Sequence, residues 1–261
     1  MSLRRHVTFR IATAVTVLLV FALGTALGTG CASTKDVDQS TAGRLEVGRQ
    51  FLAAGDYTRA GTYLRQLAKE LPKNEEVHNL LGMTYLGMAN PGAAAQSFET
   101  AVALDDDNED SGLNLSYAYI LLGKHAKSRE VLTSILDRGA YTSMERVEAN
   151  LGLSWMEEGN CGKARAHFDK ALLLDPTFVT AHFNSGKCWL KSKNFPAAVN
   201  SFQKAVDFCP GCVDPLLELA RSRHKAGEKK EAVASLEKLL RGKIDSQSAE
   251  RTKKLLKELR R

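Results

Sequence analysis

The chain has 261 residues, of which 44% are hydrophobic, 25% are charged and 7% are aromatic. This composition excludes a disordered or collagen-like chain and leaves enough residues to bury a core. The formal net charge is +6, but residues 1–30 hold three arginines and no acid, and Arg221 to Arg261 holds fourteen Lys/Arg against six Asp/Glu. Because the stretch between them is mildly acidic, the charge predicts no general nucleic-acid-binding surface.

Residues 1–30 have the pattern of an export signal. Arg4, Arg5 and Arg10 form a positive start. An apolar run of thirteen residues follows from Ile11 to Leu23, an arrangement typical of a secretory signal peptide. The alternative is an uncleaved anchor, but a membrane span needs about 20 apolar residues, and a longer run would have to include glycines and threonines.

A cysteine follows this segment directly. The sequence Leu27-Gly28-Thr29-Gly30-Cys31 resembles the lipobox of bacterial lipoproteins, with Gly28 at the position where that pattern prefers leucine. The resemblance implies that Cys31 becomes an acylated N-terminus and that residues 31–40 form a tether. It also implies the periplasmic side of the outer membrane, because Ala32 and Ser33 supply no acidic inner-membrane retention signal. The alternative is a plain signal peptide with Cys31 incidental.

A period of thirty-four residues organises the chain after the tether. Gly152, Trp155, Ala164, Phe168 and Ala171 return as Gly186, Trp189, Ala198, Phe202 and Ala205, and Gly82, Tyr85, Ala94, Phe98 and Ala101 form a similar copy upstream. The pattern resembles the tetratricopeptide (TPR) repeat, in which small residues let two antiparallel helices approach closely. The resemblance implies an all-α fold, a right-handed superhelical solenoid of six helix pairs.

The repeats have definite boundaries in the sequence. We expect them at residues 41–74, 75–108, 109–142, 145–178, 179–212 and 213–246. The phase slips by two residues within Arg138 to Met144, which predicts a longer turn between the third and fourth repeats. Residues 247–261 carry leucines on one helical face, and we expect them to form a helix that caps the end of the solenoid.

In the TPR pattern, positions 2, 5, 9 and 12 of each first helix line the inner face of the solenoid, because this spacing forms one stripe. Over the first four repeats the stripe is largely apolar, and it then becomes mixed and basic. Its candidate partner-binding residues are Leu45, Leu52, Met83, Leu86, Leu113, Tyr117, Ile120, Leu153 and Met156. Such a stripe predicts a groove for an amphipathic helix or another apolar peptide. The alternative is that part of the stripe belongs to the core.

Four further cysteines are the main hint of covalent chemistry. Cys209 and Cys212 have the spacing of redox and metal motifs, but a helical array lacks the strand context of the redox motif, and zinc would need two more ligands. Disulfide bonds are favoured in an exported protein, either between these two or involving Cys161 and Cys188, whose helix ends are expected to meet. We therefore expect no enzyme activity, no metal and no cofactor besides the covalent lipid on Cys31.

The lipobox, the six repeats and the segment from Tyr141 to Gly152, which enters the fourth repeat after the phase slip, together resemble the type IV pilus biogenesis lipoproteins of the PilF, PilW and Tgl type. The resemblance implies a pilotin, which binds secretin subunits in its groove, anchors them at the outer membrane through its lipid and promotes their multimerisation. It implies no nucleic-acid partner. The alternatives are a TPR scaffold lipoprotein for another cell-envelope complex and a redox enzyme that uses Cys209 and Cys212.

The pilotin interpretation predicts that anchoring and partner binding can be separated. A change at Cys31 is expected to misplace the protein and spare binding. Conversely, Leu113→Glu or Ile120→Glu is expected to abolish binding and leave localisation intact. A chaperone-tail receptor is disfavoured, because the positions of the carboxylate clamp of TPR co-chaperones carry Leu45, Arg49, Asn79 and Met83.

Overall fold

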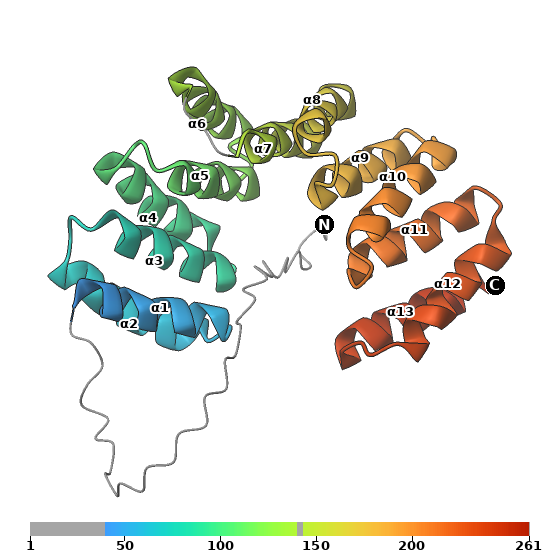
Figure 1. The fold of residues 1–261 in the computed structure, drawn as a ribbon, viewed down its shortest axis with the longest axis horizontal. Coiled ribbons are helices and arrows are strands. Elements are labelled where there is room, and N and C mark those ends of the chain that lie inside the picture. Colours follow the sequence, from blue (N-terminus) through green and yellow to red (C-terminus); the bar gives the residue numbers. More distant parts are fainter. Residues whose placement is uncertain (1–39, 140–142, 261) are drawn as a thin grey trace, which may run out of the picture.

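The computed structural model describes residues 40–139 and 143–260, and these residues form thirteen α-helices without a strand (Figure 1). The helices are α1 (Thr41–Ala53), α2 (Tyr57–Glu70), α3 (Glu75–Gly87), α4 (Pro91–Leu104), α5 (Glu109–Leu121), α6 (His125–Arg138), α7 (Met144–Glu157), α8 (Cys161–Leu174), α9 (Val179–Lys191), α10 (Phe195–Phe208), α11 (Val213–Lys225), α12 (Lys229–Arg241) and α13 (Ser246–Leu259). The all-α prediction is confirmed.

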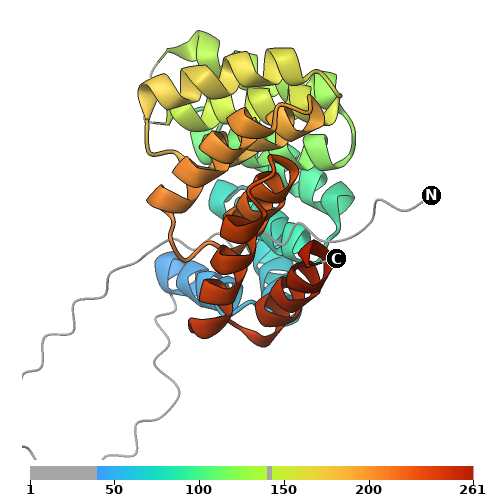
Figure 2. The ribbon, with the colours of Figure 1, turned by 90° about the vertical axis from the view of Figure 1, so that its right-hand side faces the viewer.

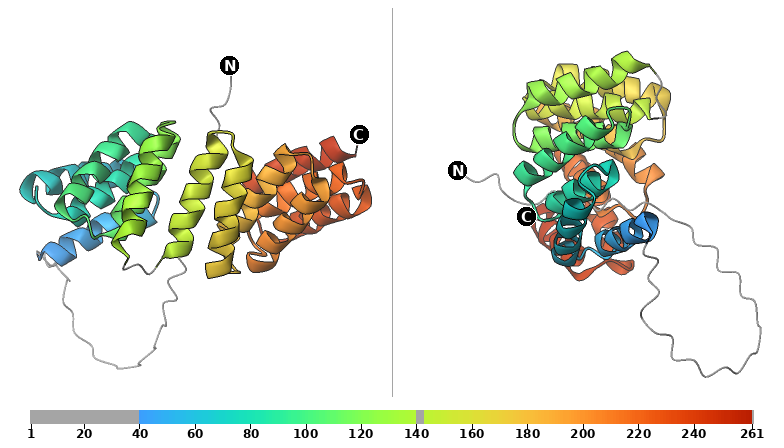
Figure 3. Two further views of the ribbon diagram at one scale, coloured as in Figure 1. Left: turned by 90° about the horizontal axis from the view of Figure 1, so that it is seen from above. Right: turned by 90° about the vertical axis from the view of Figure 1, so that its left-hand side faces the viewer.

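Consecutive helices pack as pairs, and the pairs follow one another in a row from α1 to α13 (Figure 3). Each predicted repeat contains one pair, so that residues 41–74 hold α1 and α2 and residues 213–246 hold α11 and α12. The row curves into an arch whose two ends lie on the same side of the molecule (Figures 1 and 2). In Figure 1, α6 and α8 lie on the outer side of the arch, and α5, α7 and α9 lie on its inner side.

The backbone of the turn inside each repeat has the same form six times. The second residue after the end of the first helix has a positive φ, and the next backbone N–H donates back to the helix. The N–H of Asn160, for example, donates to the Trp155 carbonyl over 2.8 Å. The same Asn160 then begins α8, where its side chain accepts a hydrogen bond from the Lys163 N–H over 3.0 Å. The side-chain cap recurs at α2, α4 and α10, whereas Lys124 and Glu228 make no such bond at α6 and α12. In four repeats, one short segment therefore ends one helix and caps the next.

Glycine occupies the positive-φ position of this turn in four repeats, as Gly55, Gly123, Gly159 and Gly227. The other two repeats have Ala89, with φ of 55°, and Lys193, with φ of 58°. A side chain in this conformation crowds the backbone, and only glycine avoids the cost.

We therefore expect Ala89→Gly and Lys193→Gly each to raise the free energy of unfolding by about 1 kcal/mol. Urea denaturation of the single variants measures this. The control is Ala103→Gly in the exposed part of α4, where glycine should cost about 0.5–1 kcal/mol. A loss of stability in Ala89→Gly equal to that of the control would contradict the explanation.

In three of the pairs, the core is built from a phenylalanine ring set against a glycine. Phe98, Phe168 and Phe202 are completely buried. A Cβ atom at the glycine facing each ring, at Gly82, Gly152 and Gly186, would lie 2.5, 2.5 and 2.7 Å from a ring carbon. The helices thus approach until ring and backbone touch, which is the physical basis of the thirty-four-residue pattern.

A completely buried alanine stands at the same repeat position in five second helices, and α6 has Ser128 there. The Oγ atom of Ser128 has no hydrogen-bond partner among the described residues. A buried hydroxyl without a partner loses its hydration and gains nothing in return.

We expect Ser128→Ala to raise the melting temperature, with a gain in stability of about 1 kcal/mol. Ser154→Ala is the matched control, because Ser154 is equally buried but its hydroxyl donates to the His125 carbonyl over 3.2 Å. That control should be destabilised. Thermal denaturation followed by circular dichroism compares the two, and an equal effect of both substitutions would show that the hydroxyl of Ser128 is satisfied in solution.

Neighbouring repeats are also joined by cations stacked on tryptophans. The Arg129 guanidinium carbon of α6 lies 3.8 Å from the centre of the Trp155 ring, and the Lys163 Nζ of α8 lies 4.1 Å from it. Arg165 stands over Trp189 in the same way at 3.9 Å. The first of these stacks connects the third repeat to the fourth, on either side of the phase slip. The turn predicted there, at residues 140–142, lies outside the described residues.

The last helix, α13, closes the row as the predicted cap. Leu255 and Leu256 are buried, and the helix contacts both α11 and α12. Asp245 caps its first turn by accepting from the Ser248 N–H over 2.9 Å. Within residues 40–139 and 143–260, no helix combines the length and the apolar character needed to cross a bilayer.

Candidate partner-binding groove

The first helices line a continuous inner surface, because α1 contacts α3, α3 contacts α5, α5 contacts α7 and α7 contacts α9. Five of the nine predicted binding residues are only partly buried there: Leu52, Met83, Leu86, Tyr117 and Leu153. The four aliphatic side chains among them pack on core clusters with one side and expose the other. We call these five residues the groove floor.

The other four predicted residues belong to the core. Leu45, Leu113, Ile120 and Met156 are only 5%, 2%, 5% and 7% exposed. Leu113, for example, packs with Leu132, Ile135, Val147 and Leu151 between the third and fourth repeats. Leu113→Glu and Ile120→Glu would thus bury a charge and disturb folding, so they cannot isolate partner binding as expected from the sequence.

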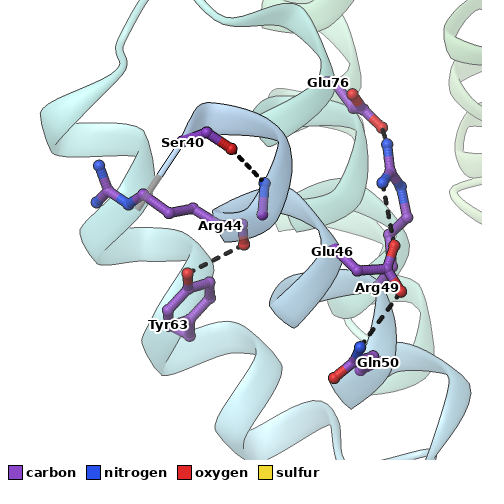
Figure 4. A network of polar contacts seen from close by, with 8 residues as sticks. Ser40, Arg44, Glu46, Arg49, Gln50, Tyr63 and Glu76 are labelled. Atoms are coloured by element: carbon purple, nitrogen blue, oxygen red, sulfur yellow. Dashed lines mark hydrogen bonds and ion pairs between the residues drawn. The ribbon is translucent and has the colours of Figure 1, made fainter. Parts of the chain in front are cut away.

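A row of polar contacts runs beside the groove floor, and the sequence analysis did not identify it. Arg49 of α1 pairs with Glu76 of α3 and with Glu46, as Figure 4 shows. One repeat further, the Asn114 amide donates to the Asn79 side chain over 3.0 Å.

The row continues from α5 to α7, where Arg146 pairs with Asp110 at 2.6 Å. The sequence contained a signal for this polar row, because residues of opposite charge stand at inner-face positions of successive repeats. The inner face therefore combines partly exposed apolar side chains with a row of polar contacts beside them.

Tyr117 places a polar atom within this floor. Burial raises the pKa of the Tyr117 hydroxyl, and the negative charge of Glu157 raises it further. Its hydroxyl consequently stays protonated at neutral pH and remains able to donate a hydrogen bond.

The later repeats change the character of the inner face, as predicted. Phe183 and Leu190 are still partly buried apolar residues. Lys187 lies over the Phe183 ring at 5.7 Å, and Arg221 pairs with Glu218 at 2.9 Å. The apolar floor thus gives way to cationic side chains between α9 and α11.

The structure assigns different states to the four cysteines. Cys209 and Cys212 form a disulfide bond in the turn between α10 and α11. Cys161 and Cys188 are free thiols, and their side chains interact with each other. Burial, followed by the contact with Cys161, raises the pKa of the Cys188 thiol to about 12. Cys188 is therefore protonated and a poor nucleophile at neutral pH.

The histidines that stand at position 4 of their repeats have structural contacts. His78 and His182 each place Nε2 close to a proline carbonyl of the preceding turn, at 3.0 Å from Pro72 O and 2.9 Å from Pro176 O. Burial lowers the pKa of His182. Among residues 40–139 and 143–260, no group of three or more His, Cys, Asp or Glu is arranged to hold a metal ion.

Comparison with known proteins identifies the repeat. Family models of the tetratricopeptide repeat match residues 79–142, 150–213 and 216–241, together more than half of the chain. The chain is a tetratricopeptide repeat protein. This TPR protein is 24% identical to human Superkiller complex protein 3 over 191 residues, which are 73% of the chain and 12% of that relative. It is 37% identical to the chloroplastic TPR protein PYG7 of Arabidopsis thaliana over 76 residues, which are 29% of the chain and 24% of the relative. It spans a quarter or less of the length of either.

Solved structures resemble the TPR protein over most of its length. PilW, described as a widely conserved type IV pilus biogenesis factor, aligns with a TM-score of 0.68 at 19% identity, over 79% of this chain and 95% of PilW. PilF of Pseudomonas aeruginosa aligns with a TM-score of 0.61 at 18% identity, over 80% and 95% of the two chains. The Cut9–Hcn1 structure aligns with a TM-score of 0.66 at 18% identity, over 84% and 42%. At these identities the similarity establishes the fold.

Proposed function

We propose that this TPR protein is a lipid-anchored pilotin of the type IV pilus machine, which holds secretin subunits in its groove at the outer membrane and promotes their multimerisation. The observation that carries the proposal is the groove floor, formed by Leu52, Met83, Leu86, Tyr117 and Leu153 on four first helices. Partly exposed apolar side chains that follow one another over four helices favour a protein partner over a small substrate.

The chemistry of the groove favours an amphipathic helix as the bound segment. Such a helix would lay its apolar side on the floor, where Met83 offers an adaptable contact. Its polar side would face the edge formed by Arg49–Glu76, Asn79–Asn114 and Arg146–Asp110. The edge has both charges, so it orients the segment more than it attracts one sign of charge.

The pilus assignment has two supports of different kinds. Cys31 stands in a sequence that resembles a lipobox, although Cys31 and the rest of residues 1–39 lie outside the described residues. Second, the chain covers 95% of both PilW and PilF, whereas it covers 42% of the Cut9–Hcn1 chain. This similarity in length and fold is compatible with a pilus biogenesis role, and the role itself is part of the proposal.

The experiment that tests this role is an affinity purification of the full protein from crosslinked outer membranes. We expect a secretin among the recovered proteins and acyl chains on Cys31 in the intact mass. Recovery of another envelope complex without a secretin would replace the pilotin with a scaffold for that complex. An unmodified Cys31 would contradict the anchor while leaving the groove to be tested separately.

A further inference from the structure

Charged residues are divided unevenly along the arch. We define the crown as residues 75–178 (α3 to α8), the first limb as residues 40–74 (α1 and α2) and the second limb as residues 179–260 (α9 to α13). The crown holds sixteen acidic and eight basic residues, whereas the first limb holds three and six and the second limb nine and seventeen. The middle of the arch is therefore negative and both limbs are positive.

The two limbs end on the same side of the molecule. In Figure 1, α1 and α13 lie at the lower ends of the arch, with the crown helices α6 and α8 at its top, and the view of Figure 2 agrees. The described chain enters the first limb at Ser40, the N-terminal cap of α1. Any anchor that precedes residue 40 is thus attached to the end of a positive limb.

The end of the second limb presents exposed lysines that can bind a negatively charged partner. Helix α13 buries Leu255 and Leu256 against α11 and α12, and its opposite side carries Lys253, Lys254 and Lys257, all exposed. In the described part of the chain, none of these three lysines has an ion-pair partner.

Helix α12 adds exposed cations to this end of the arch. Lys230, Lys238 and Arg241 lie on its solvent side and likewise form no ion pair with the described residues. Asp214 already pairs with Arg251 and Glu237 with Arg260, whereas Glu250 and Glu258 of α13 are exposed beside the lysines. Residues 229–260 nevertheless hold ten basic and five acidic residues, so this end remains positive. We call the six unpaired cations the basic end.

We propose that the basic end docks on an anionic lipid surface, so that the protein stands on the membrane with both limbs. The inference rests on the proposed lipid anchor, which brings the first limb to the same surface. The acyl chains of such an anchor supply the attachment. A basic patch near the surface adds about 1 kcal/mol of attraction per Lys or Arg to anionic headgroups, which fixes the orientation of the attached protein. The negative crown is repelled by the same lipid, so the charge pattern favours one orientation.

Contact with the membrane has a consequence for the groove. Electrostatic attraction is screened within about 8 Å at physiological ionic strength, so the basic end must lie almost at the headgroups to be held. The inner face then opens toward the bilayer, between the two limbs (Figure 1). A partner segment close to the membrane surface is within its reach.

Lysine footprinting of the full lipidated protein tests the proposal. The protein is reconstituted in vesicles of phosphatidylcholine alone or with about one-third phosphatidylglycerol, and an amine-reactive reagent is applied before mass spectrometry. We expect the modification of Lys253, Lys254 and Lys257 to fall several-fold in the anionic vesicles and to recover in high salt. Exposed crown lysines, Lys127 and Lys170, are internal controls and should react equally in both vesicles.

A charge-reversal pair supplies a second test. Lys253→Glu with Lys254→Glu should reduce binding to anionic vesicles at least tenfold, whereas Lys124→Glu with Lys127→Glu on the crown changes the same number of charges and should not. In the footprinting experiment, equal protection of Lys253, Lys254 and Lys257 in both kinds of vesicle would overturn the proposal. Absence of protection in both kinds would also overturn it, and would direct the search to an acidic macromolecule as the partner.

Intact-mass analysis of the same sample reports the anchor independently. A chain without acyl groups that still binds phosphatidylglycerol vesicles through α13 would refute the lipid anchor and support the basic end. An acylated chain whose lysines remain unprotected would support the lipid anchor and refute the role of the basic end.

Discussion

Phe168→Ala is expected to cost about 3–5 kcal/mol of stability, the usual loss when a buried phenylalanine is truncated. Phe168 is completely buried in α8 and packs with residues of α7 and α9, among them Met156 and Cys188. Its ring lies so close to Gly152 that a Cβ atom there would come within 2.5 Å of a ring carbon. Removal of the ring therefore leaves a cavity between the two helices.

This loss should spread beyond one repeat. Each repeat of a solenoid is stabilised mainly by its neighbours, so a weakened fourth repeat uncouples the two limbs of the arch. Urea denaturation should show a broadened or two-step transition, and hydrogen exchange should locate the lost protection in α7 to α9. Phe208→Ala is the control, because Phe208 is 46% exposed and stacks only on His182, with ring centres 5.6 Å apart. Comparable losses in the two variants would contradict the packing argument.

The second large effect concerns partner binding. Leu86→Glu combined with Leu153→Glu should weaken binding of the secretin segment about 100-fold or more, since buried apolar anchors at an interface are worth about 2 kcal/mol or more each. Both side chains are half-buried on the groove floor, so the glutamates can remain in water in the free protein. The fold should therefore survive, as circular dichroism can verify.

A matched substitution elsewhere shows whether position matters. Leu173→Glu introduces the same change on α8, where Leu173 is 83% exposed on a second helix. It should leave the affinity unchanged. Calorimetric titration with the purified partner segment compares the variants, and an equal loss of affinity from Leu173→Glu would mean that charge, and not the groove, governs binding.

The helical pairs could be predicted well from the sequence, because the residues that define each pair lie within one repeat. A ring such as Phe98 needs a glycine such as Gly82 opposite it, and this requirement recurs at one spacing. The same pattern could not reveal the strained turns at Ala89 and Lys193 directly, because these residues replace the glycine that would have marked them. Comparison with the four glycine-containing copies is what identifies them.

The inner face was predicted less completely, for a different physical reason. Position within a first helix determines the direction of a side chain, but its burial depends on how closely the next repeat packs. Leu86 and Ile120 stand at the same position of successive repeats, yet Ile120 is 5% exposed whereas Leu86 is only partly buried. The packing of the neighbouring repeat decides between them, and the sequence of one repeat does not describe it.

The cysteines show that spacing in the sequence is not enough to predict which pairs form disulfide bonds. Both Cys209–Cys212 and Cys161–Cys188 were candidates for disulfide bonds. The three-residue separation allows the first pair to close a turn, while the second pair meets as two thiols. The helix ends that carry Cys161 and Cys188 thus come together as expected, although the structure leaves the two sulfur atoms unbonded.

The central claim is that the inner face of the arch binds a secretin, and photo-crosslinking in cells tests it most directly. A photoreactive amino acid at the position of Leu153 lies on the groove floor, and one at the position of Leu173 lies on an exposed second helix. We predict that a secretin subunit is captured from position 153 and not from position 173. Capture from position 173 alone, or capture of an unrelated protein from position 153, would contradict the account.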